Sequence, residues 1–286
     1  MLKELIISMR PQQWYKNLVI FVSIIFSQNL FNITLWLDAI SAFIIFCMLS
    51  GSDYILNDIA DIKRDMKHPK KSKRPIACGT LKKNHALLFA ITIIIVALYA
   101  SYLINSSFFI VSIIFFMFHN AYTFFLKHII LVDIITISMH FVIRAIAGGI
   151  AIGVFVSPWL MISTFLLALF LALGKRRHEL VLLGDEAKNQ RRVFEEYTTE
   201  ALNQMISITI SALIISYALY TFLTGNIYMM TTIPLAVYCL FRYIVLIHTK
   251  NFGGETEMIF KDKNMLISMI LWLILTITIL YNRQPL

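Results

Sequence analysis

The feature that most constrains this chain is a series of nine apolar segments, each long enough to cross a lipid bilayer. They lie at approximately 15–32, 36–56, 86–105, 107–126, 129–152, 157–174, 201–223, 226–248 and 265–282. Such segments are typical of transmembrane helices, which satisfy their backbone hydrogen bonds internally. Because 59% of the 286 residues are hydrophobic and only 14% are charged, the sequence predicts an all-α polytopic membrane protein with a single transmembrane domain over residues 1–286.

The lysines and arginines gather in alternate gaps between these segments. The gap between the second and third segments holds many of them, whereas the gaps at 28–34, 105–107, 154–157 and 225–228 contain none. Basic loops stay on the cytoplasmic side, so we expect a cytoplasmic N-terminus and, with nine crossings of the plasma membrane, a C-terminus outside. The net charge of +9 lies in short loops beside the membrane. Nucleic acid is therefore not an expected partner.

The stretch NDIADIKRDMKHPKKSKRPIACG, residues 57–79, opens with acids and closes with bases. The candidate metal ligands are Asp58, Asp61 and Asp65, with Asn57 beside them. If this part is helical, Asn57, Asp61 and Asp65 share one face. Carboxylates placed together repel one another unless a cation intervenes, and Mg²⁺ binds carboxylates while keeping positions for substrate phosphates. The acids therefore indicate a Mg²⁺ site.

The basic run that follows would supply counter-charges for phosphate oxygens, with Lys70 and Arg74 as candidates. A solvated loop whose lysines only fix topology would show the same charges. Asp53 argues against that simpler interpretation, because an acid inside an apolar segment is costly and usually functional. We therefore interpret the stretch as a diphosphate site.

A second group of polar residues lies where the fourth and fifth apolar segments meet. Lys127 stands at the joint, and Asp133 and Arg144 follow inside the fifth segment. An arginine deep in a membrane needs a partner or a wet cavity. A structural salt bridge from Arg144 to Asp53 or Asp133 is one explanation, and a substrate site is the other. The small residues Ala145, Ala147, Gly148 and Gly149 favour close helix packing.

Two further basic groups flank the membrane on the predicted cytoplasmic side. The sixth segment ends in LALGKRRHEL, which places Lys175, Arg176, Arg177 and Glu179 directly after it. The first segment is entered through RPQQWYKN, whose Arg10 and Lys16 could serve as interfacial anchors or as phosphate ligands. All these groups fall on one side, which predicts a charged cavity open to the cytoplasm.

The pattern NDxxDxxxD at Asn57–Asp65 resembles the first aspartate motif of the UbiA superfamily of membrane prenyltransferases. This resemblance implies a nine-helix bundle with a cytoplasmic-facing active-site cavity. Within the superfamily, the chain is more similar to the decaprenyl-phosphate phosphoribosyltransferases. The motifs that carry this similarity are RPQQWYKN, the extended aspartate stretch, YTFFLKHIILVDI, FVIRAIAGG, SPW and LGKRRHEL. Cys78 and His178 depart from that pattern without removing a needed charge.

The second motif distinguishes two chemistries within the superfamily. Members that use a prenyl diphosphate carry a second aspartate-rich motif after the sixth helix, whereas this chain has Lys175-Arg176-Arg177-His178-Glu179 there. A basic cluster suits an extra phosphate rather than an extra metal. Phosphoribosyl pyrophosphate carries such a phosphate on its 5-position. The resemblance therefore implies an enzyme that transfers a 5-phosphoribosyl group to a polyprenyl phosphate and releases diphosphate.

The expected roles follow from that reaction. Asp58, Asp61 and Asp65 hold Mg²⁺, and Lys127, Arg144 and Tyr122 contact substrate phosphates or the leaving group. The remaining substrate-binding candidates are Arg10, Lys16, Asn57, Lys70, Arg74, Asp133, Lys175, Arg176, Arg177 and Glu179. The expected partners are phosphoribosyl pyrophosphate, a polyprenyl phosphate and the bilayer, with a possible homo-oligomer. A UbiA-type prenyltransferase is the nearer alternative, and a transporter with an ion path along Asp53, Asp133 and Arg144 is the more distant one.

Overall fold

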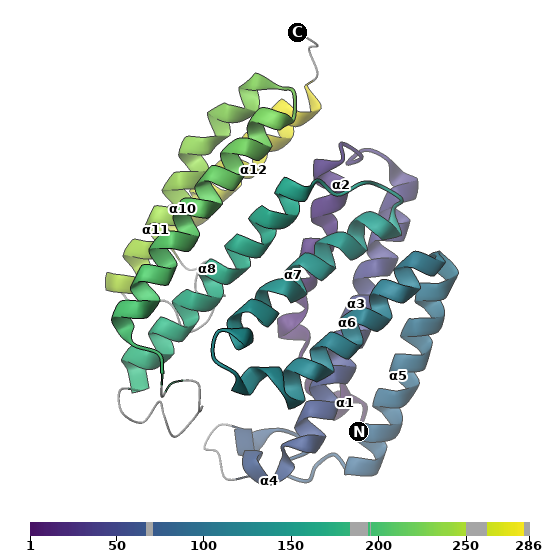
Figure 1. The fold of residues 1–286 in the computed structure, drawn as a ribbon. Coiled ribbons are helices and arrows are strands. Elements are labelled where there is room, and N and C mark those ends of the chain that lie inside the picture. Colours follow the sequence, from purple (N-terminus) through teal and green to yellow (C-terminus); the bar gives the residue numbers. More distant parts are fainter. Residues whose placement is uncertain (67–70, 184–193, 195, 250–261, 283–286) are drawn as a thin grey trace. The chain divides into compact units, whose positions relative to one another are not determined.

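The computed structural model describes residues 1–66, 71–183, 194, 196–249 and 262–282. Within these ranges the regular secondary structure is helical throughout and forms two compact units (Figure 1). The first unit contains residues 1–124 and 143–155, and the second contains residues 125–142 and 156–286. The boundary passes through one helix, α7 (Val132–Ala151), which contributes to both units.

The first unit is built on the N-terminal helices. They are α1 (Leu2–Ser8), η1 (Pro11–Phe21), α2 (Val22–Phe26), α3 (Ile33–Ala60), α4 (Ile62–Asp65), η2 (Lys71–Lys73), α5 (Lys83–Ile104) and α6 (Ser106–Phe124). Helix α3 packs along α5, and α5 packs along α6. Buried aromatic side chains fill the space between α3 and α6, where the Phe46 ring lies 4.5 Å from that of Phe115 and 5.8 Å from that of Phe108. This apolar packing fixes the helix whose end carries the aspartates.

The C-terminal half of α7 closes on the N-terminal segment of the first unit. A Cβ added at Gly148 would overlap the backbone carbonyl of Ile20, so only glycine allows this approach of η1 to α7. The Ser23 hydroxyl donates to the carbonyl of Ala145 at 2.8 Å, in the same contact. The expectation that small residues permit close packing here is confirmed.

The second unit is built on the C-terminal helices. They are η3 (Leu126–His128), the first part of α7, α8 (Pro158–Leu183), α10 (Thr199–Leu223), η6 (Ile227–Thr232), α11 (Ile233–Thr249) and α12 (Lys263–Tyr281). Helix α10 packs along α8, and α11 packs along α12. Gly174 on α8 lies against the side chains of Tyr243 and Ile247 on α11, which are among the most buried residues of this unit. The close contact anchors the end of α8 that carries the basic residues.

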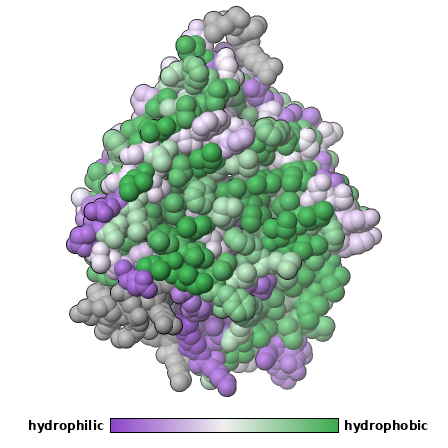
Figure 2. Space-filling view, in the orientation of Figure 1, coloured by the Kyte–Doolittle hydropathy of each residue, from purple (hydrophilic) through white to green (hydrophobic). Residues whose placement is uncertain are grey.

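Eight helices are long and apolar enough to cross a membrane, and they correspond to the second through ninth predicted segments. The first predicted segment, 15–32, forms η1 and the short helix α2, and α2 ends at Phe26. Within the described ranges this segment therefore does not add a ninth long helix. Large apolar side chains are exposed along the crossing helices, as Ile95 on α5 and Ile274 on α12 illustrate. Figure 2 shows hydrophobic residues over most of the visible face and hydrophilic ones toward its margins. Such a surface suits contact with lipid and not with water.

Candidate functional site

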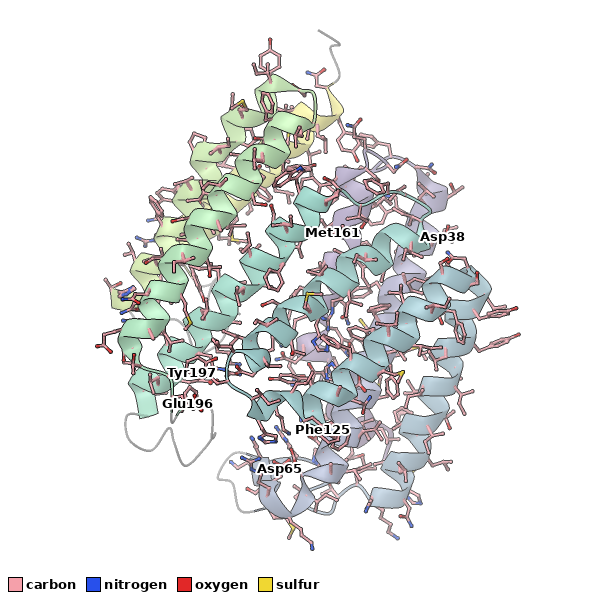
Figure 3. All side chains as sticks on the ribbon, in the orientation of Figure 1. Asp38, Asp65, Phe125, Met161, Glu196 and Tyr197 are labelled. Atoms are coloured by element: carbon pink, nitrogen blue, oxygen red, sulfur yellow. The ribbon has the colours of Figure 1, made fainter. Side chains whose placement is uncertain are left out.

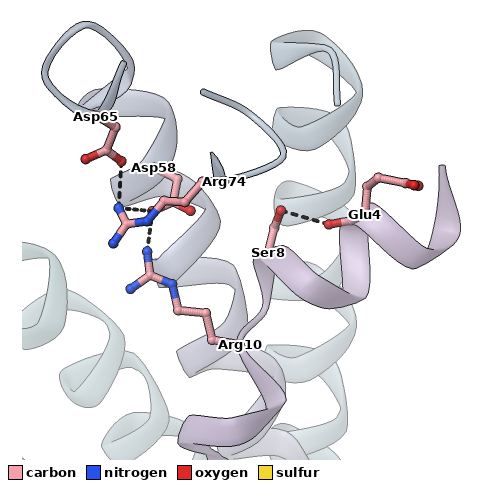
Figure 4. Close-up of polar contacts among 6 residues, drawn as sticks. All are labelled: Glu4, Ser8, Arg10, Asp58, Asp65 and Arg74. Atoms are coloured by element: carbon pink, nitrogen blue, oxygen red, sulfur yellow. Dashed lines mark hydrogen bonds and ion pairs between the residues drawn. The ribbon is translucent and has the colours of Figure 1, made fainter. Parts of the chain in front are cut away.

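The aspartate stretch forms a buried ion-pair cluster at one end of α3. Asp58 lies on the last turn of α3 and Asp65 at the end of the short helix α4, and each residue is no more than 3% exposed. Figure 3 places Asp65 at the opposite end of α3 from Asp38. Figure 4 shows that both carboxylates turn toward the guanidinium group of Arg74.

Arg74 bridges the two buried carboxylates with a single nitrogen. Its Nη1 donates to Asp58 Oδ1 at 3.0 Å and to Asp65 Oδ2 at 2.6 Å. A second arginine, Arg10, donates from Nη2 to the same Asp58 oxygen. Two positive and two negative side chains therefore neutralise one another, which offsets the cost of taking the carboxylates out of water.

Arg10 reaches this cluster through an unusual backbone conformation. Helix α1 ends where the Ser8 hydroxyl donates to the carbonyl of Glu4 at 2.8 Å (Figure 4). Arg10 then adopts φ 53° and ψ 64°, directly before Pro11 starts η1. Its guanidinium carbon lies 4.7 Å from the centre of the Tyr54 ring, which is a cation–π contact. Non-glycine residues adopt a positive φ rarely, and mostly where the surrounding contacts require it.

A helix break at Asp61 lies among the candidate acids. Helix α3 ends at Ala60, and Asp61 has φ −94° and ψ 8° before α4 begins. Backbone hydrogen bonds from Asp61 to Asn57 and from Asp65 to Asp61 keep the four-residue spacing across this break, and the chain brings Asp58 and Asp65 together around Arg74. Asn57 and Asp61 are half-buried.

The donor set of this cluster nevertheless fits a divalent cation. In the part of the chain that the structure describes, no three Asp, Glu, His or Cys side chains already form a set that could hold a metal ion. Asp58 and Asp65 do share a cation, because the Arg74 guanidinium stands between their oxygens. Carboxylate oxygens are also the ligands that Mg²⁺ prefers. Lys70, a further candidate of the basic run, lies outside the described residues.

A second buried polar group in the first unit surrounds Arg144. Its Nε donates to Asn17 Oδ1 at 2.7 Å, and its guanidinium carbon lies 4.8 Å from the centre of the Phe115 ring. Arg144 is 5% exposed. The Asn17 amide in turn donates to the Cys47 sulfur at 3.3 Å. Asn17, the last residue of RPQQWYKN, is thus a partner of Arg144 that sequence reasoning missed.

Asp53 is buried nearby with partners of its own. Its Oδ1 accepts a hydrogen bond from the Asn120 amide at 2.8 Å, and its Oδ2 lies 3.9 Å from His119 Nδ1. Asn120 and His119 are adjacent residues on α6, and neither was singled out from the sequence. Asp53 and its two partners lie on different apolar segments, so no regular spacing in the sequence connects them. Only the packed structure shows that they are in contact. Lys16 on η1 and Tyr122 on α6 are both half-buried in this unit.

The second unit holds a separate network centred on Asp133. Asp133 is fully buried; its Oδ2 accepts from Arg176 Nε at 2.8 Å and its Oδ1 accepts from the Tyr197 hydroxyl at 3.1 Å. The same hydroxyl accepts a hydrogen bond from the backbone N–H of Leu131 at 3.0 Å, and Leu131 has φ 63°. Burial, and secondarily the charge of Asp133, raises the pKa of Tyr197, so its hydroxyl stays protonated and donates. Tyr197 lies beside the start of α10 (Figure 3).

The three bases after the sixth apolar segment have different surroundings. Helix α8 continues to Leu183, so these residues are helical, and Arg176 Nη1 donates to Glu179 Oε2 one turn later at 2.7 Å. Arg176 is 2% exposed and is held by two carboxylates. Arg177 is half-buried and donates from Nε to Asn203 Oδ1 at 2.7 Å, whereas Lys175 is exposed. Lys127, on η3, is half-buried in the same unit.

The two acids considered as salt-bridge partners of Arg144 each contact other polar side chains as well. Asp133 pairs with Arg176, and Asp53 pairs with Asn120 and His119. Sequence reasoning identified both acids as functional candidates but could not assign their partners. Tyr197 and Asn203 were missed altogether, because they lie beyond the basic motif that drew attention to this region.

Comparison with known proteins places this chain in a family. The UbiA prenyltransferase family matches residues 18–281. A decaprenyl-phosphate phosphoribosyltransferase of Mycolicibacterium smegmatis is 30% identical over 94% of this chain and 90% of its own length. The protein of the same name from Corynebacterium glutamicum is 28% identical over 96% of this chain and 86% of its own length.

Solved structures agree with this assignment at the level of the fold. A UbiA homologue from Archaeoglobus fulgidus, bound to GPP and Mg²⁺, superimposes with a TM-score of 0.74 at 17% identity, over 97% of this chain and 99% of its own. A digeranylgeranylglyceryl phosphate synthase superimposes with a TM-score of 0.69 at 19% identity, over 99% of each chain. The chain belongs to the UbiA prenyltransferase family.

Proposed function

We propose that this protein is a Mg²⁺-dependent enzyme that transfers a 5-phosphoribosyl group from phosphoribosyl pyrophosphate to a polyprenyl phosphate and releases diphosphate. The observation that carries the proposal is the basic end of α8, where Lys175 and Arg177 flank an Arg176 already neutralised by two carboxylates. A positively charged helix end suits a substrate phosphate. The names of the relatives that match nearly the whole chain support the same reaction.

The first unit supplies the residues for the diphosphate end of the donor. Asp58, Asp61 and Asp65, with Asn57, are the residues that would hold Mg²⁺. When bound there, the ion neutralises the negative charge that develops on the leaving diphosphate. Arg10, Arg74 and Lys16 would bind phosphate oxygens, and Lys70 belongs to the same basic run. Their task is to hold the leaving group in place and to exclude other orientations.

The buried Arg144 serves a related purpose in this proposal. Asn17 holds the guanidinium group of Arg144 by accepting a hydrogen bond from its Nε. Arg144, Lys127 and Tyr122 are assigned to substrate phosphates or the leaving group. Because positive charge develops at the anomeric carbon of the ribose, the anionic lipid phosphate needs positioning more than activation.

The second unit would bind the 5-phosphate of the donor. Lys175 and Arg177 are the direct ligands in this proposal. Asp133, Glu179 and Tyr197 hold Arg176 in the helix, and Asn203 orients Arg177. Arg176 thereby acts as a positioning residue that keeps the end of α8 fixed.

The proposal includes the membrane arrangement that the charges predict. It places nine helical crossings in the plasma membrane, with η1 and α2 forming the first, and it opens a charged cavity to the cytoplasm. The N-terminus then lies inside and the C-terminus outside. A homo-oligomer is compatible with this arrangement.

Prenyl transfer from a prenyl diphosphate to an aromatic or lipid acceptor is the second candidate. It is favoured by the family name and by the fold shared with a homologue that binds GPP and Mg²⁺. The feature against it is the basic sequence on α8, where a second acidic motif would be needed for a second metal ion.

One experiment separates the two candidates. The purified full chain receives ribose-labelled phosphoribosyl pyrophosphate, a polyprenyl monophosphate and Mg²⁺, and a parallel reaction receives a labelled prenyl diphosphate with candidate acceptors. We expect label to enter the lipid phase in the first reaction and a chelator to abolish the transfer. Transfer in the second reaction alone would replace the proposal with prenyl transfer.

A further inference from the structure

Two arginine side chains occupy the carboxylates that the proposed function assigns to Mg²⁺. Arg74 Nη1 contacts both Asp58 and Asp65, and Arg10 contacts the same oxygen of Asp58. We propose that Arg10 and Arg74 are internal counter-ions that a divalent cation must displace, so that metal binds tightly only together with a diphosphate that accepts the released guanidinium groups. This inference rests on the proposed function of the site.

The contacts at Asp58 make simultaneous occupation unfavourable. Its Oδ1 already accepts from two guanidinium groups. A Mg²⁺ ion binds a carboxylate oxygen at about 2.0–2.1 Å, so an ion on this oxygen would lie within a few ångströms of two positive groups. Like charges at that separation repel strongly where water is scarce. The ion and the arginines therefore compete for the same oxygen.

Burial explains why the two carboxylates always require cationic partners. The side chains of Asp58 and Asp65 are each 2% exposed. Buried carboxylates that lose their counter-ion are strongly unfavourable, so the arginines leave only when another cation arrives. Two carboxylates and two guanidinium groups sum to zero charge, and exchange for one Mg²⁺ ion frees both guanidinium groups.

The arginines are less buried than the aspartates that they neutralise. Their side chains are 21% and 24% exposed, so their outer atoms already reach water. A guanidinium group offers several donors in a plane, which match the oxygens of a phosphate. A diphosphate bound beside the metal would therefore give the displaced arginines new partners. Metal and diphosphate then tighten each other's binding, and this coupling is reciprocal by thermodynamic linkage.

The decisive measurement is Mn²⁺ binding without any phosphate compound. Mn²⁺ is titrated into the purified full chain and its free concentration is followed by electron paramagnetic resonance. We expect Arg74→Gln to bind Mn²⁺ about tenfold more tightly than the wild type, because the competitor of Asp58 and Asp65 is gone. Arg10→Gln should change binding in the same direction.

A matched control removes an equal charge without removing the ion pair. Lys63 is an exposed residue on α4, two positions before Asp65. Lys63→Gln measures the effect of lost charge alone, and we expect it to change Mn²⁺ affinity by less than about threefold. Equal tightening by Lys63→Gln and Arg74→Gln would overturn the inference, as would an Arg74→Gln variant that binds Mn²⁺ no more tightly than the wild type.

A second titration tests where the arginine goes. At saturating Mn²⁺, labelled inorganic pyrophosphate is bound to each variant, and we expect Arg74→Gln to bind it about tenfold more weakly than the wild type. Unchanged pyrophosphate affinity would mean that the released guanidinium group finds no phosphate partner, which contradicts the coupling. If Arg74→Gln does not fold, Arg10→Gln removes the other counter-ion of Asp58 and serves for both titrations.

The inference and the proposed function fail in different experiments. Neither titration contains phosphoribosyl pyrophosphate or a lipid acceptor, so both results stand whatever group the enzyme transfers. Tightened metal binding in Arg74→Gln without phosphoribosyl transfer in the wild type would uphold the exchange and reject the reaction. If the wild type transfers phosphoribosyl groups but Arg74→Gln binds Mn²⁺ no more tightly than the wild type, the reaction is upheld and the exchange is rejected.

Discussion

The ion pair between Asp133 and Arg176 offers a direct test of how the second unit is held together. Asp133 is fully buried and Arg176 has a side chain only 3% exposed, so neither group can be rehydrated in place. Asp133→Asn removes the charge that Arg176 faces and leaves Glu179, which is 23% exposed, as the remaining acid. Breaking one partner of a buried pair typically costs about 3–5 kcal/mol. We therefore expect Asp133→Asn to destabilise the protein by about this amount.

The assay is thermal unfolding of the purified protein in detergent, followed by intrinsic fluorescence. For a chain of this size the expected loss lowers the midpoint by about 6–10 °C. Arg242→Gln is the matched control in the same unit, because it breaks a pair with Asp262 in which the arginine is 26% exposed. Because the Asp262 carboxylate keeps a hydrogen bond from the Met265 backbone N–H, we expect a smaller loss for Arg242→Gln than for Asp133→Asn. If Asp133→Asn lowers the midpoint no more than Arg242→Gln does, the reasoning is refuted.

A double substitution separates lost charge balance from lost shape. Arg176→Gln combined with Asp133→Asn removes both charges and keeps amide groups that can hydrogen-bond. Because the unpaired buried charge is then absent, we expect the double variant to unfold at a higher temperature than Asp133→Asn alone. A lower midpoint for the double variant would show that the arginine stabilises the unit independently of Asp133.

Four other substitutions test the site and the packing that holds it. Asp58→Asn and Asp61→Asn should each abolish nearly all turnover while the protein still folds and inserts into the membrane, and near-normal activity in either would reject the metal assignment. Arg177→Ala should raise the KM for phosphoribosyl pyrophosphate more than the KM for lipid; the opposite pattern in steady-state kinetics would exchange the two pockets. Gly148→Ala should lower stability by about 1–3 kcal/mol, because its methyl group would meet the Ile20 carbonyl, and an unchanged unfolding midpoint would contradict that contact.

The sequence was sufficient for the class of fold because membrane helices depend on local composition. A segment of about 20 apolar residues must be helical in lipid, since no water is present to satisfy its backbone groups. Eight of the predicted segments appear as long helices for that reason. The first predicted segment differs, because its residues form η1 and the short α2, and a hydropathy pattern does not distinguish these from one long α-helix.

The sequence also identified most of the charged residues of the candidate site. Acids and arginines in apolar surroundings are costly, so Asp53, Asp133 and Arg144 stand out without any structure. Their partners were not predictable, because each pair joins residues far apart in the chain. Asp133 and Arg176 are 43 positions apart, and Arg144 and Asn17 are 127 positions apart. No local pattern encodes such contacts.

The sequence by itself therefore determined the helical membrane class, the family and the chemical character of the site, because apolar length and charge are properties of the residues. Only the tertiary structure decided which charges neutralise one another. It ended α3 at Ala60, so that Asp58 and Asp65 meet at Arg74, and it closed Tyr197 onto Asp133. The physical reason is that a buried charge is tolerated only beside a suitable partner, and the packing of distant helices decides which partner comes within reach.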